Sequence, residues 1–195
     1  MIRFNEACGN AGKVVTARLL PDTDLIEGIE EICKSNQIKY AYVSCFGSFK
    51  KCGYMYLVPK STAKVKAGYG DIITKEGPIE FLNGTGVVCQ NNNKYNTHFH
   101  ATMCDQNGTV FGGHIVKGHT PTLTTVDLII MEIKDVEMLR VYDEETEEYK
   151  EVTVEAGTML VDPKVFFMRN IGCVNNTIIH ECVHSVSYTH LTLPT

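Results

Sequence analysis

The chain of 195 residues has no tryptophan and no apolar run near the ~20 residues that a membrane-spanning helix needs. Its start, MIRFNEACGN, also lacks the basic segment and apolar core of a secretory signal. The hydrophobic fraction of 44% is that of a globular protein with a sizeable core. These features exclude a membrane protein and lead us to expect a cytoplasmic one.

Paired cysteines and a basic surface are missing too. None of the eight cysteines forms a C-x-x-C pair, so we expect free thiols in a reducing compartment. The net charge is -5, and the densest charge cluster, DEETEEYKE at 143–151, is acidic. Because a nucleic-acid partner selects a positive surface, direct DNA binding is not expected.

One amphipathic helix and many short strands can be recognised. Apolar residues recur at helical spacing after Asp24, which predicts a helix from about 24 to 35 with its glutamates facing water. KYAYVSCFGSF predicts a buried strand that stops at Gly47, and strand-like segments separated by turn residues follow as far as about 133. This order favours an α+β fold, in which the helix flanks a small antiparallel sheet.

Three regions follow from this pattern. Residues 1–145 are expected to form the main domain, and residues 146–157 an acidic linker or strand that ends near Ala156-Gly157. Residues 158–195 differ in character and are expected to be a partial segment that does not fold alone.

A histidine cluster is predicted in THFHATMCDQNGTVFGGH. His98 and His100 leave one face of a strand because side chains alternate. A two-residue Asn-Gly turn would place Ala101 opposite His114, whereas a three-residue turn or a bulge would place His100 there. The second register brings three imidazoles together, which suits zinc.

Other roles for these histidines stay open. Strand histidines are often surface residues or core groups that bond to a neighbour. Asp105 and His119 are candidate fourth ligands or supporting groups. A metal-dependent enzyme is an alternative, but no Glu or Asp lies beside the histidine cluster at a spacing that marks it as the general base. A binding or regulatory module is therefore favoured.

The chain resembles the PPC domain family, named for plants and prokaryotes, over about residues 12–145. The resemblance rests on RLLPDTDLIEGIEEICKSNQIKYAYVSCFGSF, GPIEFLNGTGVV, HFHATMCDQNGTVFGGHIVKG and TTVDLIIMEI. It implies an α+β domain that assembles as a homotrimer, with a metal site, most plausibly for zinc, at His98, His100 and His114.

Plant members of this family add a DNA-binding function that does not carry over. Their domain follows AT-hook segments, and no Arg-Gly-Arg-Pro core occurs in these 195 residues. A DNA-binding role would thus be inherited from the family alone, which does not establish it. GPIEFL at 77–82 resembles the family's partner-contact segment, with Pro78 in place of the usual basic residue, so a protein partner is a further expectation.

HECVH at 180–184 matches the zinc-peptidase signature H-E-x-x-H. On a helix, His180 and His184 would bind zinc while Glu181 holds the attacking water. The stretch VDPKVFFMRNIGCVNNTIIHECVH also resembles the active-site helix of ImmA/IrrE-type metallopeptidases. Glu181 would be the catalytic residue under this alternative.

The residues after this motif do not complete a peptidase. His190 falls where a third ligand would lie, but Ser187 replaces the glycine that turns the chain back. SVSYTHLTLPT at 185–195 resembles translated sequencing-adapter sequence and is expected to be unstructured. We interpret 158–184 as a truncated metallopeptidase-like segment.

Overall fold

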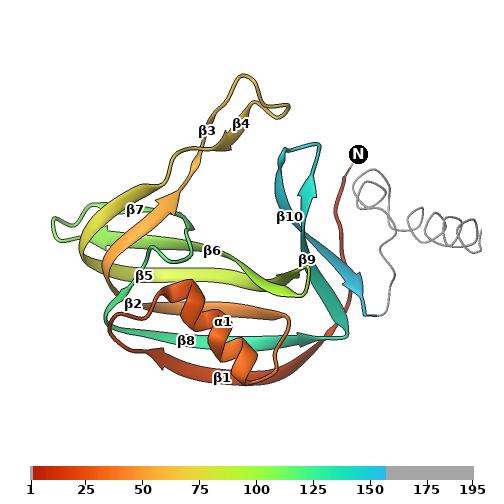
Figure 1. Cartoon of the computed structure of the whole chain (residues 1–195), viewed down its shortest axis with the longest axis horizontal. Coiled ribbons are helices and arrows are strands. Elements are labelled where there is room, and N and C mark those ends of the chain that lie inside the picture. Colours follow the sequence, from red (N-terminus) through yellow and green to blue (C-terminus); the bar gives the residue numbers. More distant parts are fainter. Residues whose placement is uncertain (1, 157–195) are drawn as a thin grey trace, which may run out of the picture.

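The computed structural model describes residues 2–156, and most of them lie in strands. An eight-stranded sheet has the order β1-β8-β2-β7-β6-β5-β9-β10, and β3 and β4 form a separate hairpin (Figure 1). The strands are β1 Asn10–Leu19, β2 Ala41–Met55, β3 Leu57–Pro59, β4 Ala67–Tyr69, β5 Ile73–Asn91, β6 Lys94–Asp105, β7 Val110–Ile115, β8 Thr122–Lys134, β9 Val136–Asp143 and β10 Glu148–Glu155.

The expected α+β fold with a small antiparallel sheet is wrong, because the sheet is large and the fold is mainly β. Strand β2 pairs with β8, with β5 and, at Tyr54 and Met55, with β7. Since β5, β6 and β7 are also consecutive neighbours, β2, β5, β6 and β7 close into a ring. The sheet is also mixed, since β5 and β9 run parallel at the pair Gln90 and Leu139.

The sheet is larger than expected because two long strands, β2 and β5, continue through glycine and proline residues that usually end a strand. Strand β2 does not stop at Gly47 but continues through a bulge to Met55. A Cβ on Gly47 would lie 2.2 Å from the carbonyl oxygen of Thr125, so glycine permits β8 to pass closely. Strand β5 likewise continues across Gly77-Pro78, where two shorter strands were expected.

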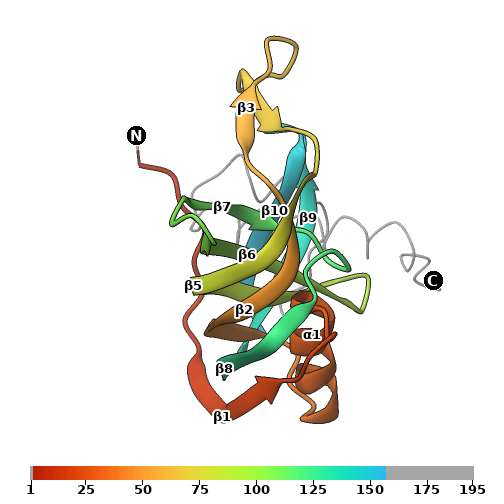
Figure 2. The same ribbon diagram turned by 90° about the vertical axis from the view of Figure 1, so that its left-hand side faces the viewer.

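Helix α1, Leu25–Ser35, confirms the predicted helix. Its N-cap is Asp24, whose side chain accepts hydrogen bonds from the backbone N–H groups of Ile26 and Glu27. The apolar side of the helix lies against one face of the sheet (Figure 2). No helix within residues 2–156 has the length and apolar character to cross a bilayer.

One glutamate of α1 does not face water as predicted. Glu30 is 7% exposed and accepts hydrogen bonds from the backbone and the hydroxyl of Thr97 on β6. Lys117 forms an ion pair with the same carboxylate. The buried charge is therefore paired, and it joins the helix to the sheet.

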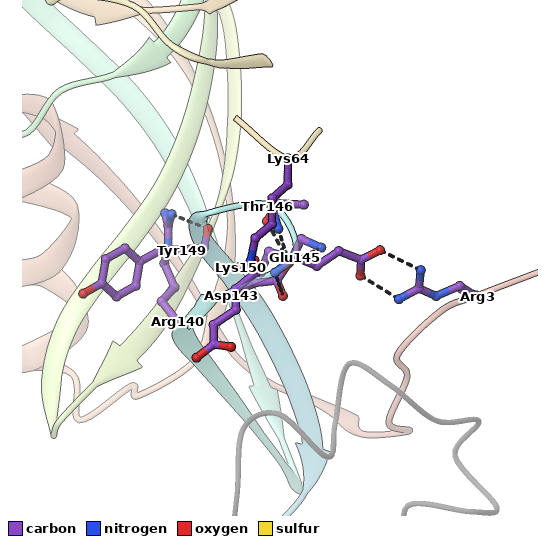
Figure 3. Close-up of polar contacts among 9 residues, drawn as sticks. Arg3, Lys64, Arg140, Asp143, Glu145, Thr146, Tyr149 and Lys150 are labelled. Atoms are coloured by element: carbon purple, nitrogen blue, oxygen red, sulfur yellow. Dashed lines mark hydrogen bonds and ion pairs between the residues drawn. The ribbon is translucent and has the colours of Figure 1, made fainter. Parts of the chain in front are cut away.

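Hairpins β3–β4 and β9–β10 project from the same side of the sheet (Figure 1), and hydrogen bonds of Lys64 join their turns. The ammonium of Lys64 donates to the carbonyl of Glu144 at 2.7 Å, and its backbone N–H donates to Glu147. Arg3 forms two hydrogen bonds to Glu145 on the same β9–β10 turn, of 2.9 and 2.7 Å (Figure 3). The turn is thus held from two separate parts of the chain.

Candidate metal centre

The turn between β6 and β7 decides the register of the predicted histidines. The backbone N–H of Asp105 donates to the carbonyl of Thr109, which leaves a three-residue turn of Gln106 to Gly108. The Asp105 side chain also accepts from the N–H groups of Asn107 and Thr109. The three-residue turn is one of the two predicted alternatives, and it places His100 directly opposite His114.

Glycine lets β7 carry His114 into this position. A Cβ on Gly113 would lie 2.3 Å from the carbonyl oxygen of Met55 on β2. Strand β7 can therefore pair with β6 on one side and approach β2 closely on the other.

His98 and His100 lie on the face of β6 opposite Thr97, which contacts Glu30 of α1, and His114 lies beside them on β7. One ligand atom from each of His98, His100 and His114 can be chosen so that all lie within 4.8 Å of one another. The Nε2 atoms of His98 and His100 are 3.0 Å apart. His98 and His114 are half-buried and His100 is exposed, so the cluster is open on one side.

The surroundings favour neutral imidazoles. The pKa of His114 is lowered to about 4. Burial is the largest cause, and the neighbouring His98, His100 and Arg140 act in the same direction. Burial and His98 also lower the pKa of His100. Because metals bind the neutral form of imidazole, both rings are in the ligand state near pH 7.

A carboxylate that the sequence did not indicate lies beside the cluster. Oε1 of Glu151, on β10, is 2.6 Å from Nδ1 of His98 and 3.4 Å from Nε of Arg140 on β9. Burial raises the pKa of Glu151, but the contact with His98 and the charge of Arg140 outweigh it and leave the pKa below its ordinary value. The Tyr69 ring packs against His114, with ring centroids 5.2 Å apart.

These neighbours come from segments distant in sequence. Alternation along YKEVTVE places Glu151 on one face of a strand, but only the pairing of β10 with β9 brings it opposite Arg140. The 1–145 and 146–157 boundaries predicted from sequence separate Glu151 from His98, which it contacts.

Asp105 and His119 do not join the cluster. Asp105 forms an ion pair with Lys75 at 2.8 Å, and this contact and two backbone N–H groups lower its pKa to about 2. His119 is exposed on the loop between β7 and β8. The other predicted site residues, Glu181, His180 and His184, lie outside the described part of the chain.

Within residues 2–156, the buried side-chain polar atoms without a regular hydrogen bond are Nδ1 of His114, Nε of Arg140 and Oε1 of Glu151. All three belong to this cluster. Nε of Arg140 and Oε1 of Glu151 face each other as an ion pair. The unpartnered Nδ1 of His114 calls for another explanation, and a bound cation fits, since three imidazoles are a usual donor set for zinc.

Fold and site together define a mainly β domain with a three-histidine cluster on one sheet face. Residues 6–134 match the model of the Plants and Prokaryotes Conserved (PCC) domain, and the chain belongs to this family. This confirms the resemblance seen in the sequence. A search of curated proteins found no significant match.

Solved structures share the fold at low identity. A metal-containing protein of Archaeoglobus fulgidus has a TM-score of 0.65 and 22% identity, and the match covers 77% of this chain and 99% of that one. A plant- and prokaryote-conserved protein of Pyrococcus horikoshii has a TM-score of 0.64 and 20% identity, covering 77% and 100%. A candidate DNA-binding protein of Bacteroides thetaiotaomicron has a TM-score of 0.61 and 17% identity, covering 75% and 97%.

Proposed function

We propose that this chain is a metal-binding module that holds one zinc ion through His98, His100 and His114. The observation that carries the proposal is the convergence of three imidazoles, one of which has a buried nitrogen without a hydrogen-bond partner. The low pKa values of His100 and His114 support it, because no proton has to be displaced near pH 7.

The spacing is compatible with a small adjustment on binding. Two nitrogens bound to tetrahedral zinc at 2.0–2.1 Å lie about 3.3 Å apart. The separation of 3.0 Å between the Nε2 atoms of His98 and His100 is close to this value. The longer distances within the cluster, which reach up to 4.8 Å, would have to shorten when zinc binds. A zinc ion held there would keep a fourth position on the open side of the cluster for water or a small ligand.

We further propose that the module works as a homotrimer. Five apolar side chains on β1, β2 and β8 are 38% to 63% exposed on the face opposite α1, and we call them the outer apolar patch: Val14, Tyr42, Phe46, Ile129 and Met131. They are adjacent across the sheet, because Met131 pairs with both Val14 and Tyr42. A second copy would remove this apolar surface from water.

The outer apolar patch and the histidines share one sheet face. Tyr42 pairs with Val87 on β5, and Val87 pairs with His98 on β6. Assembly through the patch would therefore bring a neighbouring subunit to the border of the metal site.

A cytoplasmic location and a regulatory role through a protein partner complete the proposal. The cysteines within residues 2–156 are free thiols, which is compatible with a reducing compartment. Direct contact with DNA is not part of the proposal, since the net charge is -5.

The proposal is tested by metal analysis of the full chain purified without a histidine tag. Wild type and His119→Ala should each contain about one zinc per chain, because His119 lies outside the cluster, and His100→Ala should lose most of it. Equal zinc in all three proteins, or none in wild type, would reject the site.

A further inference from the structure

Glu151 and His100 contact opposite edges of the His98 ring. Nε2 of His98 faces Nε2 of His100 at 3.0 Å, whereas Nδ1 faces Oε1 of Glu151 at 2.6 Å. The carboxylate therefore lies behind His98, away from the point at which the three rings converge.

The position of Glu151 is fixed by the β9–β10 hairpin. Glu151 pairs with Arg140 across the ladder, and Arg140 is 9% exposed. The Arg140 guanidinium donates to the carbonyl of Tyr149 at 3.2 Å, and its Nε lies 3.4 Å from Oε1 of Glu151. The Arg140 guanidinium, which is held by the β9–β10 pair, thus favours the charged form of the Glu151 carboxylate and keeps it beside His98.

The distance from Oε1 of Glu151 to Nδ1 of His98 is that of a charge-assisted contact. The same oxygen has no regular hydrogen bond. A buried carboxylate oxygen in this position can accept a hydrogen bond from Nδ1–H of the ring. An imidazole that donates from Nδ1 has its lone pair on Nε2, the edge that faces the cluster.

We propose that Glu151 is a positioning residue for the metal ligand His98, and that Arg140 holds Glu151 in place. The Glu151 carboxylate accepts a hydrogen bond from Nδ1–H of His98, which orients the ring and leaves Nε2 as the ligand atom. The inference rests on the proposed function, since it assigns a role toward the same metal. It also makes the β9–β10 hairpin, which follows the family match at 6–134, a working part of the site.

The test is a competition of the full chain with a chromophoric chelator for zinc. Glu151→Ala should weaken zinc binding about 10–100-fold, the usual effect of losing such a partner. Glu151→Gln should fall in between, because the amide oxygen still accepts a hydrogen bond but carries no charge. Glu145→Gln is the matched control, since Glu145 forms an exposed ion pair on the turn of the same hairpin and should bind as wild type does.

A second measurement separates positioning from a structural role. In metal-free protein, nitrogen NMR should find His98 protonated at Nδ1 in wild type and in Glu145→Gln, with a shift toward the Nε2-protonated form in Glu151→Ala. Loss of stability alone would not change this tautomer. If Glu151→Ala fails to fold, Glu151→Gln carries both measurements.

Different results would overturn the two proposals. Wild type without zinc would reject the proposed function. One zinc in wild type, with equal affinity and an unchanged His98 tautomer in Glu151→Gln and Glu151→Ala, would reject positioning while leaving the site intact. A cobalt-substituted protein whose visible spectrum changes in Glu151→Gln would make Glu151 a direct ligand and would also reject positioning.

Discussion

His100 on β6 lies directly opposite His114 on β7, and the three-residue turn between the strands sets this pairing. Side chains alternate along a strand, so a register shift of one residue moves His114 to the other face. The candidate metal site therefore depends on the length of a turn that touches none of its ligands.

The metal-free protein should lose stability as pH falls from about 6.5 toward 4. The pKa of His114 is about 4 in the folded chain against 6.5 ordinarily, so the unfolded chain binds more protons in this window and is favoured by acid. Urea unfolding with chelator present should show a steeper loss in wild type than in His114→Gln. Asp105 and Asp143, with pKa values of about 2, affect both proteins equally. Parallel curves between pH 4 and 6.5 would refute the shift.

Asp24→Ala should destabilise the protein by about 2 kcal/mol, more than the loss of an ordinary helix cap. Besides capping α1, Asp24 accepts a hydrogen bond of 2.8 Å from the N–H of Thr120, which ties the helix start to the loop before β8. Urea unfolding measures the change. Glu27→Gln, in the exposed first turn, is the control and should stay within about 0.5 kcal/mol of wild type; an equal effect of both would argue against the double role.

Ile129→Asp should dissociate the proposed trimer into monomers. The substitution places a charge in the middle of the outer apolar patch, where a second copy would have to bury it. Light scattering gives the mass, and zinc content should remain near one per chain. Val110→Asp changes an apolar residue that is 62% exposed outside the patch and should leave the assembly unchanged. A monomeric wild type would remove the trimer from the proposal.

A mobility-shift assay with A·T-rich DNA at ~150 mM salt should show no binding. The net charge of -5 opposes the contacts with phosphates that DNA binding requires. Salt titration is the natural check, because binding through phosphates would strengthen steeply at low salt. A specific shift at the higher salt would contradict this expectation and establish direct DNA binding by the chain.

Local signals in the sequence were sufficient for the helix and for the histidine pair. The apolar spacing after Asp24 and the capping side chain specify α1, because both act within one or two turns. His98 and His100 share a face through strand alternation alone. The sequence left two registers for the next strand, with either Ala101 or His100 opposite His114. Family membership was also readable from separated motifs.

Contacts between distant strands could not be read in this way. The large sheet was missed because β2 and β5 continue through Gly47 and through Gly77-Pro78, where local rules favour a break. The burial of Glu30 depends on Thr97 and Lys117, which belong to other elements.

The sequence by itself determined the helix, the family and which three imidazoles could meet. Only the tertiary structure decided the register that joins His100 to His114, and it alone brought Glu151 behind His98. The reason is that alternation and helical period act over a few residues, whereas strand pairing across the sheet sets which side chains share a site.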